Sequence, residues 1–221
     1  MAFNWDFIIK FLPNYGMATL LTIRLAAFGI LLSVLLGVSC SLVLYFRVRV
    51  VGAIVRGYIE LSRNTPLLIQ LFFLYYGIPK LGILISSHAC AIIGLTFLGG
   101  GYMAEAFRSG LESVSKAQLE SGLSIGLNSF QMTRFVIFPQ ALSVAVPALG
   151  ANCIFLIKET SVMSIIAIQD LMSLTKELIG MYYNTVETLT ILVICYLLLL
   201  LPVSFLFLFI ERRLRYAEFG L

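Results

Sequence analysis

The chain has 221 residues, of which 60% are hydrophobic and only 12% are charged. About 25% of the residues of a soluble domain are charged, and the mean hydropathy of +1.01 is far above the soluble range, so composition excludes a soluble globular protein. The formal net charge is +4. The basic residues are distributed along the chain as membrane topology requires and do not form a nucleic-acid-binding patch. Apolar stretches recur along the whole length, so we expect the membrane domain to be nearly the whole protein.

Residues 1–16 precede the first long apolar stretch. They lack the basic region and the small-residue cleavage site of a signal peptide. Their aromatic residues Trp5, Phe7 and Phe11 suit an amphipathic segment that lies at the membrane surface. We therefore predict a retained N-terminal interfacial segment over 1–16, followed by a membrane domain over 17–221.

Five apolar stretches are long enough to span a bilayer, which predicts an all-α polytopic membrane protein with about five transmembrane helices. They run over residues 17–46, 55–77, 89–107, 137–157 and 186–210. Basic residues concentrate on the cytoplasmic face of membrane proteins. Here they follow the first, third and fifth spans, all on one face, so we expect the N-terminus outside and the C-terminus inside. These basic residues are Arg47, Arg49, Arg56, Arg108, Lys116, Arg134, Arg212, Arg213 and Arg215.

The sequence lacks the residue patterns of metal binding and of phosphate binding. The four cysteines are far apart within apolar stretches, and the single histidine, His88, has no neighbouring Cys or His to complete a metal site. No G-x-x-x-x-G-K-[ST] loop is present to hold phosphates, and the glycine run 99–101 fits close helix packing better than ligand binding. We expect a non-catalytic chain that holds no metal and no cofactor.

The connection over about 108–136 is the most polar part of the chain, and it falls on the predicted cytoplasmic face. Ser115 and Gln118 stand at the spacing of a capping box, and so do Asn128 and Gln131. Gly126 between them favours the left-handed conformation that ends a helix. The pattern predicts a helix-turn-helix whose polar surface a soluble partner could bind. Taken alone, these caps would favour an ordinary solvated loop.

This connection and its flanks, YMAEAFRSGLESVSKAQLESGLSIGLNSFQMTRFVIFPQAL, resemble the "EAA" loop of ABC importer permeases. Two further stretches, LSRNTPLLIQLFFLYYGIP and LIKETSVMSIIAIQDL, are similar to motifs of the polar amino acid subfamily, whose permeases carry histidine, glutamine, arginine and related solutes. The resemblance covers nearly the whole chain. It departs at residues 120–122, Glu-Ser-Gly in place of Glu-Ala-Ala, where glycine lowers helix propensity by about 1 kcal/mol relative to alanine. We therefore expect a softer coupling helix.

The resemblance implies a type I ABC importer permease fold in a bacterial cytoplasmic (inner) membrane. It implies four kinds of partner: two ATP-binding-cassette ATPases that use ATP and Mg²⁺, a second permease that is the same or a related chain, an extracytoplasmic amino-acid-binding protein, and a polar amino acid as cargo. The loop residues that we expect to couple the chain to the ATPase are Glu112, Gln118, Glu120, Gly126 and Arg134.

A zwitterionic amino acid needs a donor or cation for its carboxylate and an acceptor for its ammonium group along its path. Polar side chains inside a membrane are costly and mark functional sites by default, although they also pair across helices. A structural ion pair at a helix end is an equal alternative for Lys158 and Glu159, and Arg63 could instead snorkel or pair with Glu60. Glu105 and Arg108 fit a pair on the helix surface. The candidate path residues are Arg63, Thr65, Gln70, Asn152, Lys158, Glu159, Thr160 and Ser161.

Two other functional classes compete with this interpretation. A membrane-embedded enzyme lacks support, because a single histidine excludes H-E-x-x-H and no G-x-S-x-G elbow is present. An ion-coupled secondary carrier is the better rival, since such carriers also bury charges and break helices, although they usually join two inverted halves in a longer chain. The predicted helix-turn-helix favours the ABC permease, because a secondary carrier has no ATPase to bind.

Overall fold

The structure is a computed structural model that describes residues 3–219, and of residues 215–219 it describes the backbone alone. Residues 1–2 and 220–221 of the predicted segments lie outside this range. All regular elements in the described range are helices, which confirms the predicted fold class. Their bounds are α1 Trp5–Tyr45, α2 Arg49–Asn64, α3 Leu67–Phe72, α4 Ser87–Glu112, α5 Lys116–Ser124, α6 Ser129–Met132, α7 Phe138–Glu159, α8 Leu171–Tyr182 and α9 Thr185–Phe219.

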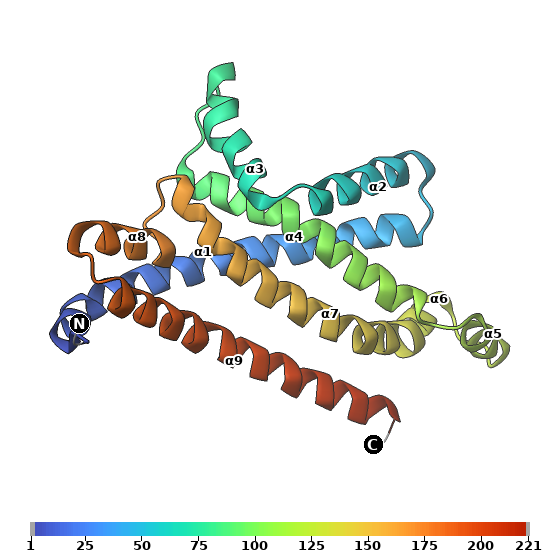
Figure 1. The fold of residues 1–221 in the computed structure, drawn as a ribbon. Coiled ribbons are helices and arrows are strands. Elements are labelled where there is room, and N and C mark those ends of the chain that lie inside the picture. Colours follow the sequence, from blue (N-terminus) through green and yellow to red (C-terminus); the bar gives the residue numbers. More distant parts are fainter. Residues whose placement is uncertain (1–2, 220–221) are drawn as a thin grey trace.

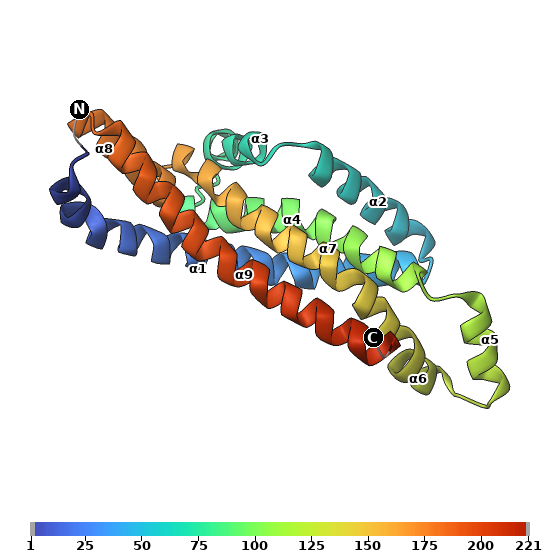
Figure 2. The same cartoon turned by 60° about the horizontal axis from the view of Figure 1, so that its bottom comes forward.

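Four segments of the described chain are long and apolar enough to cross a membrane: α1, α4, α9 and the segment Ser129–Ile165, which contains α7. They run alongside one another in Figures 1 and 2. Helix α4 packs between α1 and α7, and α7 packs in turn against α9. Side chains of α1, α4 and α7 build the main hydrophobic core, in which Leu25, Leu95, Met103 and Leu156 are buried.

The second predicted span, 55–77, is not one continuous helix. Helix α2 ends at Asn64, Thr65 is extended (φ −113°, ψ 123°), and α3 begins at Leu67. Pro66 causes this break, because proline has no N–H to donate and disfavours the helical conformation in the residue before it. After α3 the chain continues through a π-helical turn (Phe73–Gly77) and a 3₁₀ turn (Ile78–Leu81).

The glycine run of α4 lies where α1, α2 and α7 pack closely against α4. A methyl group at Gly99 would overlap Ser33 of α1 and Leu156 of α7, and one at Gly101 would overlap Ser62 of α2. A side chain at either position would hold the neighbouring helix away from α4. The packing interpretation of this run is confirmed.

The predicted N-terminal segment continues into the first span without a break, because α1 runs from Trp5 to Tyr45. Trp5 is exposed, whereas Phe7 and Tyr15 are buried against α8 and α9. The Tyr15 hydroxyl lies 3.1 Å from the Thr175 hydroxyl of α8. The start of α1 is therefore anchored by tertiary contacts, and its predicted place at the membrane surface stays a prediction.

Different helices and turns lie at the two ends of the bundle. The first turns of α1, helix α8 and the start of α9 lie at one end, and α5, α6 and the α1–α2 turn lie at the other (Figure 1). Figure 2 shows the same separation from another direction. The predicted helix-turn-helix thus lies at the end opposite to α8.

Candidate functional site

A pocket of about 320 Å³ opens beside the break between α2 and α3. We call it the central pocket, because the α4 residues that line it, Leu98 and Tyr102, lie near the middle of that helix. Small-molecule pockets in proteins start at about 300 Å³, so its size suits a small solute. Its walls are Arg63, Asn64, Thr65, Pro66, Leu67, Leu68, Leu98, Tyr102, Phe155, Glu159 and Val162.

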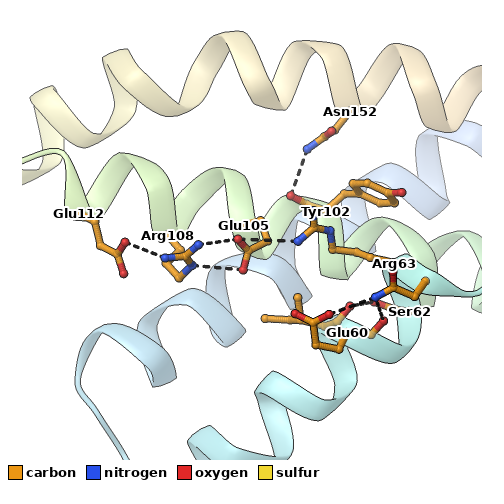
Figure 3. A network of polar contacts seen from close by, with 10 residues as sticks. Glu60, Ser62, Arg63, Tyr102, Glu105, Arg108, Glu112 and Asn152 are labelled. Carbon is orange, nitrogen blue, oxygen red and sulfur yellow. Dashed lines mark hydrogen bonds and ion pairs between the residues drawn. The ribbon is translucent and has the colours of Figure 1, made fainter.

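Arg63 supplies the positive charge of the central pocket. Its guanidinium carbon lies 5.4 Å from the centre of the Tyr102 ring, within cation–π range. Its Nη1 atom lies 3.8 Å from Glu105 Oε2, and the Arg63 side chain is 38% exposed. Figure 3 shows Arg63 between Tyr102 and Glu105. The pairing with Glu60 considered from the sequence is not formed, because the Glu60 carboxylate accepts a hydrogen bond from Asn64 instead.

A second pocket, of about 380 Å³, has Glu105 but not Arg63 in its walls, whereas the central pocket has Arg63 but not Glu105. We call it the inner pocket, and its walls are Leu44, Arg56, Ile59, Glu60, Glu105, Arg108 and Glu112. Arg108 bonds both Glu105 oxygens, at 2.6 and 3.2 Å, and also donates to Glu112 at 2.7 Å (Figure 3). The predicted surface pair of Glu105 and Arg108 is confirmed, and it extends into a chain of alternating charges.

Helices α5 and α6 form a capped helix-turn-helix. Ser115 and Gln118 exchange hydrogen bonds of 3.3 Å, and Asn128 and Gln131 exchange bonds of 2.9 Å, so both predicted capping boxes are present. Gly126 has the left-handed φ of 81° that the turn requires.

Gly122 lies directly against the Met132 side chain of α6. A methyl group there would lie 2.9 Å from the Met132 sulfur, so Met132 occupies the space that an alanine would need. This contact joins α5 to α6. The predicted softness of α5 stays a prediction.

Comparison with known proteins places the chain in a family. Residues 14–216 match the model of the binding-protein-dependent transport system inner membrane component. The nopaline transport system permease protein NocM of Agrobacterium fabrum is 32% identical, with 89% of this chain and 86% of NocM covered. The glutamine transport system permease protein GlnP of Escherichia coli is 27% identical over 97% of this chain and 99% of its own. A crystal structure of an amino acid ABC transporter with histidines is 29% identical, with a TM-score of 0.88 over 96% of this chain and 100% of that one.

The chain belongs to this family. It is the permease component of an ABC importer in the inner membrane, and the family assigns binding of the solute and hydrolysis of ATP to partner proteins. The predictions of a multi-pass, non-catalytic permease are thereby confirmed.

The structure brings some of the predicted path residues of the permease together. Arg63, Thr65 and Glu159, from the α2–α3 break and the end of α7, line the central pocket. Asn152 lies beside it and donates a hydrogen bond of 3.1 Å to the Tyr102 carbonyl (Figure 3). These four positions remain candidates for contact with cargo.

The other predicted path residues are not in the walls of the central pocket. The Gln70 amide is buried and donates to the Ser62 and Thr65 carbonyls at 3.2 and 2.9 Å, so it bridges the helix break. The buried Thr160 hydroxyl donates to the Ile157 carbonyl. Lys158 is exposed, and the Ser161 carbonyl accepts a bond from Ser164. Their roles in transport stay predictions.

The predicted coupling residues of the permease serve three different structural purposes. All five are exposed: Gln118 and Gly126 shape the helix-turn-helix, Glu112 pairs with Arg108 on α4, and Glu120 and Arg134 point from the α5–α6 region without a side-chain hydrogen bond or ion pair in the described structure. Glu120 and Arg134 can therefore meet a partner without first breaking a hydrogen bond or an ion pair within the described structure.

Three side chains that are prominent in the structure are not among the residues predicted from the sequence. Tyr102 and Phe155 form the aromatic walls of the central pocket, with ring centres 5.2 Å apart. The spacing of Leu98, Tyr102 and Glu105 on one helical face could have indicated Tyr102. Asp170 is fully buried and caps α8 by accepting from the Ser173 N–H at 2.9 Å. An aspartate directly before an apolar helical segment is a recognisable helix start.

Proposed function

We propose that the permease imports amino acids and that the central pocket contacts the cargo during passage. The observation that carries this proposal is the presence of Arg63 and Glu159, from different helices, in the walls of one pocket of about 320 Å³. A guanidinium suits the cargo carboxylate, and a carboxylate suits the cargo ammonium group. The amino-acid, glutamine and nopaline transporters to which the chain is similar support the same cargo class.

The proposed assembly contains two ATPases, an extracytoplasmic binding protein and a second permease that is the same or a related chain. Its proposed orientation has the N-terminus outside and the C-terminus inside. The distribution of basic residues supports this orientation, because Arg47, Arg49 and Arg134 lie at the end of the bundle that carries α5 and α6.

The proposed coupling contact is the α5–α6 pair, with Glu120 as its main charged side chain. Glu120 is exposed, and the helix that carries it is fixed by a capping box and by the Gly122–Met132 contact. A short helix held in this way transmits a push from a bound ATPase to α4 and α7, which flank it in the chain. The position of α5 and α6 supports an arrangement in which cargo enters at the opposite end of the bundle and the ATPase binds at the α5–α6 end.

Uptake by the reconstituted importer tests the proposal. Proteoliposomes containing the permease, its ATPase and its second permease are supplied with the binding protein, ATP and labelled L-glutamine, L-histidine or L-arginine. We expect ATP-dependent uptake of at least one of them, and Arg63→Gln should lower its uptake at least about tenfold, because a charged hydrogen bond is lost. Uptake driven by an ion gradient without the ATPase would instead identify a secondary carrier. Uptake of none of the three would contradict the proposed cargo class.

A further inference from the structure

We propose that Glu105 competes with the cargo carboxylate for Arg63, so that the Arg63–Glu105 pair separates the central pocket from the inner pocket until cargo arrives. This inference rests on the proposed function. It assigns Glu105, which lines no part of the central pocket, a role in setting how tightly the central pocket holds a carboxylate.

The two pockets follow one another along α4. The central pocket uses Leu98 and Tyr102, and the inner pocket uses Glu105, Arg108 and Glu112. At about 1.5 Å per residue, Leu98 and Glu112 are about 21 Å apart along the helix axis. Tyr102 and Glu105 are less than one turn apart, so the boundary between the pockets lies between these two residues. Arg63 reaches from the central pocket to Glu105 across that boundary (Figure 3).

Arg63 is the weakly bound member of this charge chain. Its 3.8 Å separation from Glu105 is too long for a hydrogen bond, and the Arg63 side chain is more than one-third exposed. Glu105 does not depend on Arg63, because both of its carboxylate oxygens accept from Arg108. Arg63 can therefore leave Glu105 without leaving that carboxylate unpaired.

A carboxylate in the central pocket offers Arg63 a better partner than Glu105 does. Guanidinium and carboxylate groups form two parallel hydrogen bonds when their geometry is free to adjust. The Tyr102 ring supports the guanidinium from the central-pocket side. When Arg63 turns to the cargo, the Arg63–Glu105 link across the boundary opens and Glu105 stays bound to Arg108. The cargo carboxylate therefore removes the Arg63–Glu105 pair from the boundary, so that the cargo can pass into the inner pocket.

Binding measurements on the assembled permease–ATPase complex test this competition. The probes are labelled L-glutamine, L-histidine and L-arginine, each compared with its α-carboxamide, which has no carboxylate. Glu105→Gln removes the competitor, so we expect about two- to fivefold tighter binding of the amino acid, the size of a partly exposed ion pair. The carboxamide should show no gain. Glu105→Asp keeps the charge and should stay close to wild type.

Glu177→Gln is the control, because Glu177 is an exposed carboxylate on α8 that lines neither the central pocket nor the inner pocket. It should leave binding of both probes unchanged. An unchanged or weaker affinity of Glu105→Gln for the amino acid would overturn the competition, and so would an equal gain for the carboxamide. Failure of the wild-type complex to bind any of the amino acids would overturn the proposed function itself, and the competition with it.

Discussion

Lys158 and Glu159 are adjacent in the sequence but have different surroundings. Lys158 is exposed, whereas Glu159 lines the central pocket opposite the helix break that carries Arg63. Successive residues on a helix point about 100° apart, so two neighbouring charges rarely face the same cavity. The helix geometry favours Glu159 over Lys158 as the residue that meets the ammonium group.

We expect Glu159→Gln to raise the KM for amino acid uptake at least about tenfold, because an amide replaces the charge that pairs with the ammonium group. ATP-dependent uptake by the reconstituted importer measures this effect. Glu177→Gln is the control, since Glu177 is an exposed carboxylate on α8 outside the central pocket, and its KM should match wild type. An unchanged KM in Glu159→Gln would mean that the carboxylate is structural.

Asp170 is a fully buried carboxylate between the segment that contains α7 and helix α8. Burial raises the pKa of its carboxyl from 3.8 to about 6, against the opposing hydrogen bonds of the Ser173 and Met172 N–H groups and the charge of Lys176. Between these two values the folded permease holds a proton that the unfolded chain has released. The contribution of the Asp170 carboxyl to the free energy of unfolding is therefore full below the unfolded pKa of 3.8 and is lost as the pH rises through about 6.

Asp170→Asn should remove this pH dependence, because the amide caps α8 equally well and carries no charge. The wild-type free energy of unfolding should fall, relative to that of the variant, by about 2 kcal/mol between pH 4 and pH 7. Thermal unfolding in detergent across this range measures the difference. Parallel pH profiles of the two proteins would show that Asp170 does not titrate in this window.

At the scale of elements, the break at Pro66 shapes the central pocket, and the α5–α6 pair shapes the proposed coupling surface. Gln70 satisfies two carbonyls left free by the break, which holds Arg63 and Thr65 at the pocket wall. Two capping boxes give the short helices α5 and α6 a stability that isolated helices of nine and four residues lack. Local backbone chemistry therefore fixes the structure of both elements to which we assign a proposed function.

Charge reversal on α5 tests the coupling surface. We expect Glu120→Lys to leave membrane insertion intact, because one exposed residue outside the spans contributes little to it, and to weaken ATPase binding or uncouple hydrolysis from uptake. ATPase co-purification, stimulated hydrolysis and uptake are measured together. Lys116→Glu is the control, because it reverses another exposed charge in the first turn of the same helix. An equal effect in both variants would show that the position of the charge on α5 does not matter. Wild-type values for Glu120→Lys would move the contact to residues 128–134.

At the scale of the whole molecule, the orientation decides which end meets the binding protein. Leu84, in the loop before α4, is 88% exposed, and Ile125, between α5 and α6, is 78% exposed. Single cysteines at these positions should react oppositely in intact cells: Leu84→Cys should be labelled by an impermeant thiol reagent, and Ile125→Cys only after the cells are opened. Cys40, Cys90 and Cys153 are buried, and the unsubstituted permease serves as the background control. The reverse pattern would invert the proposed topology.

The sequence alone determined the features that depend on local chemistry. Hydropathy identified the four long spans, capping spacings identified α5 and α6, and three motifs identified the family. These signals are readable because a bilayer requires long apolar helices, and a capping box is complete within four residues.

Tertiary structure alone decided which polar residues meet. Arg63 and Glu105 are 42 positions apart, and their pairing depends on how α2 crosses α4 at the glycine run. The same packing places Glu159 in the central pocket beside Tyr102 and leaves Lys158 exposed. Sequence spacing fixes contacts within one helix, but the rotation and crossing of two helices depend on every side chain between them, so the central pocket became visible only in the folded chain.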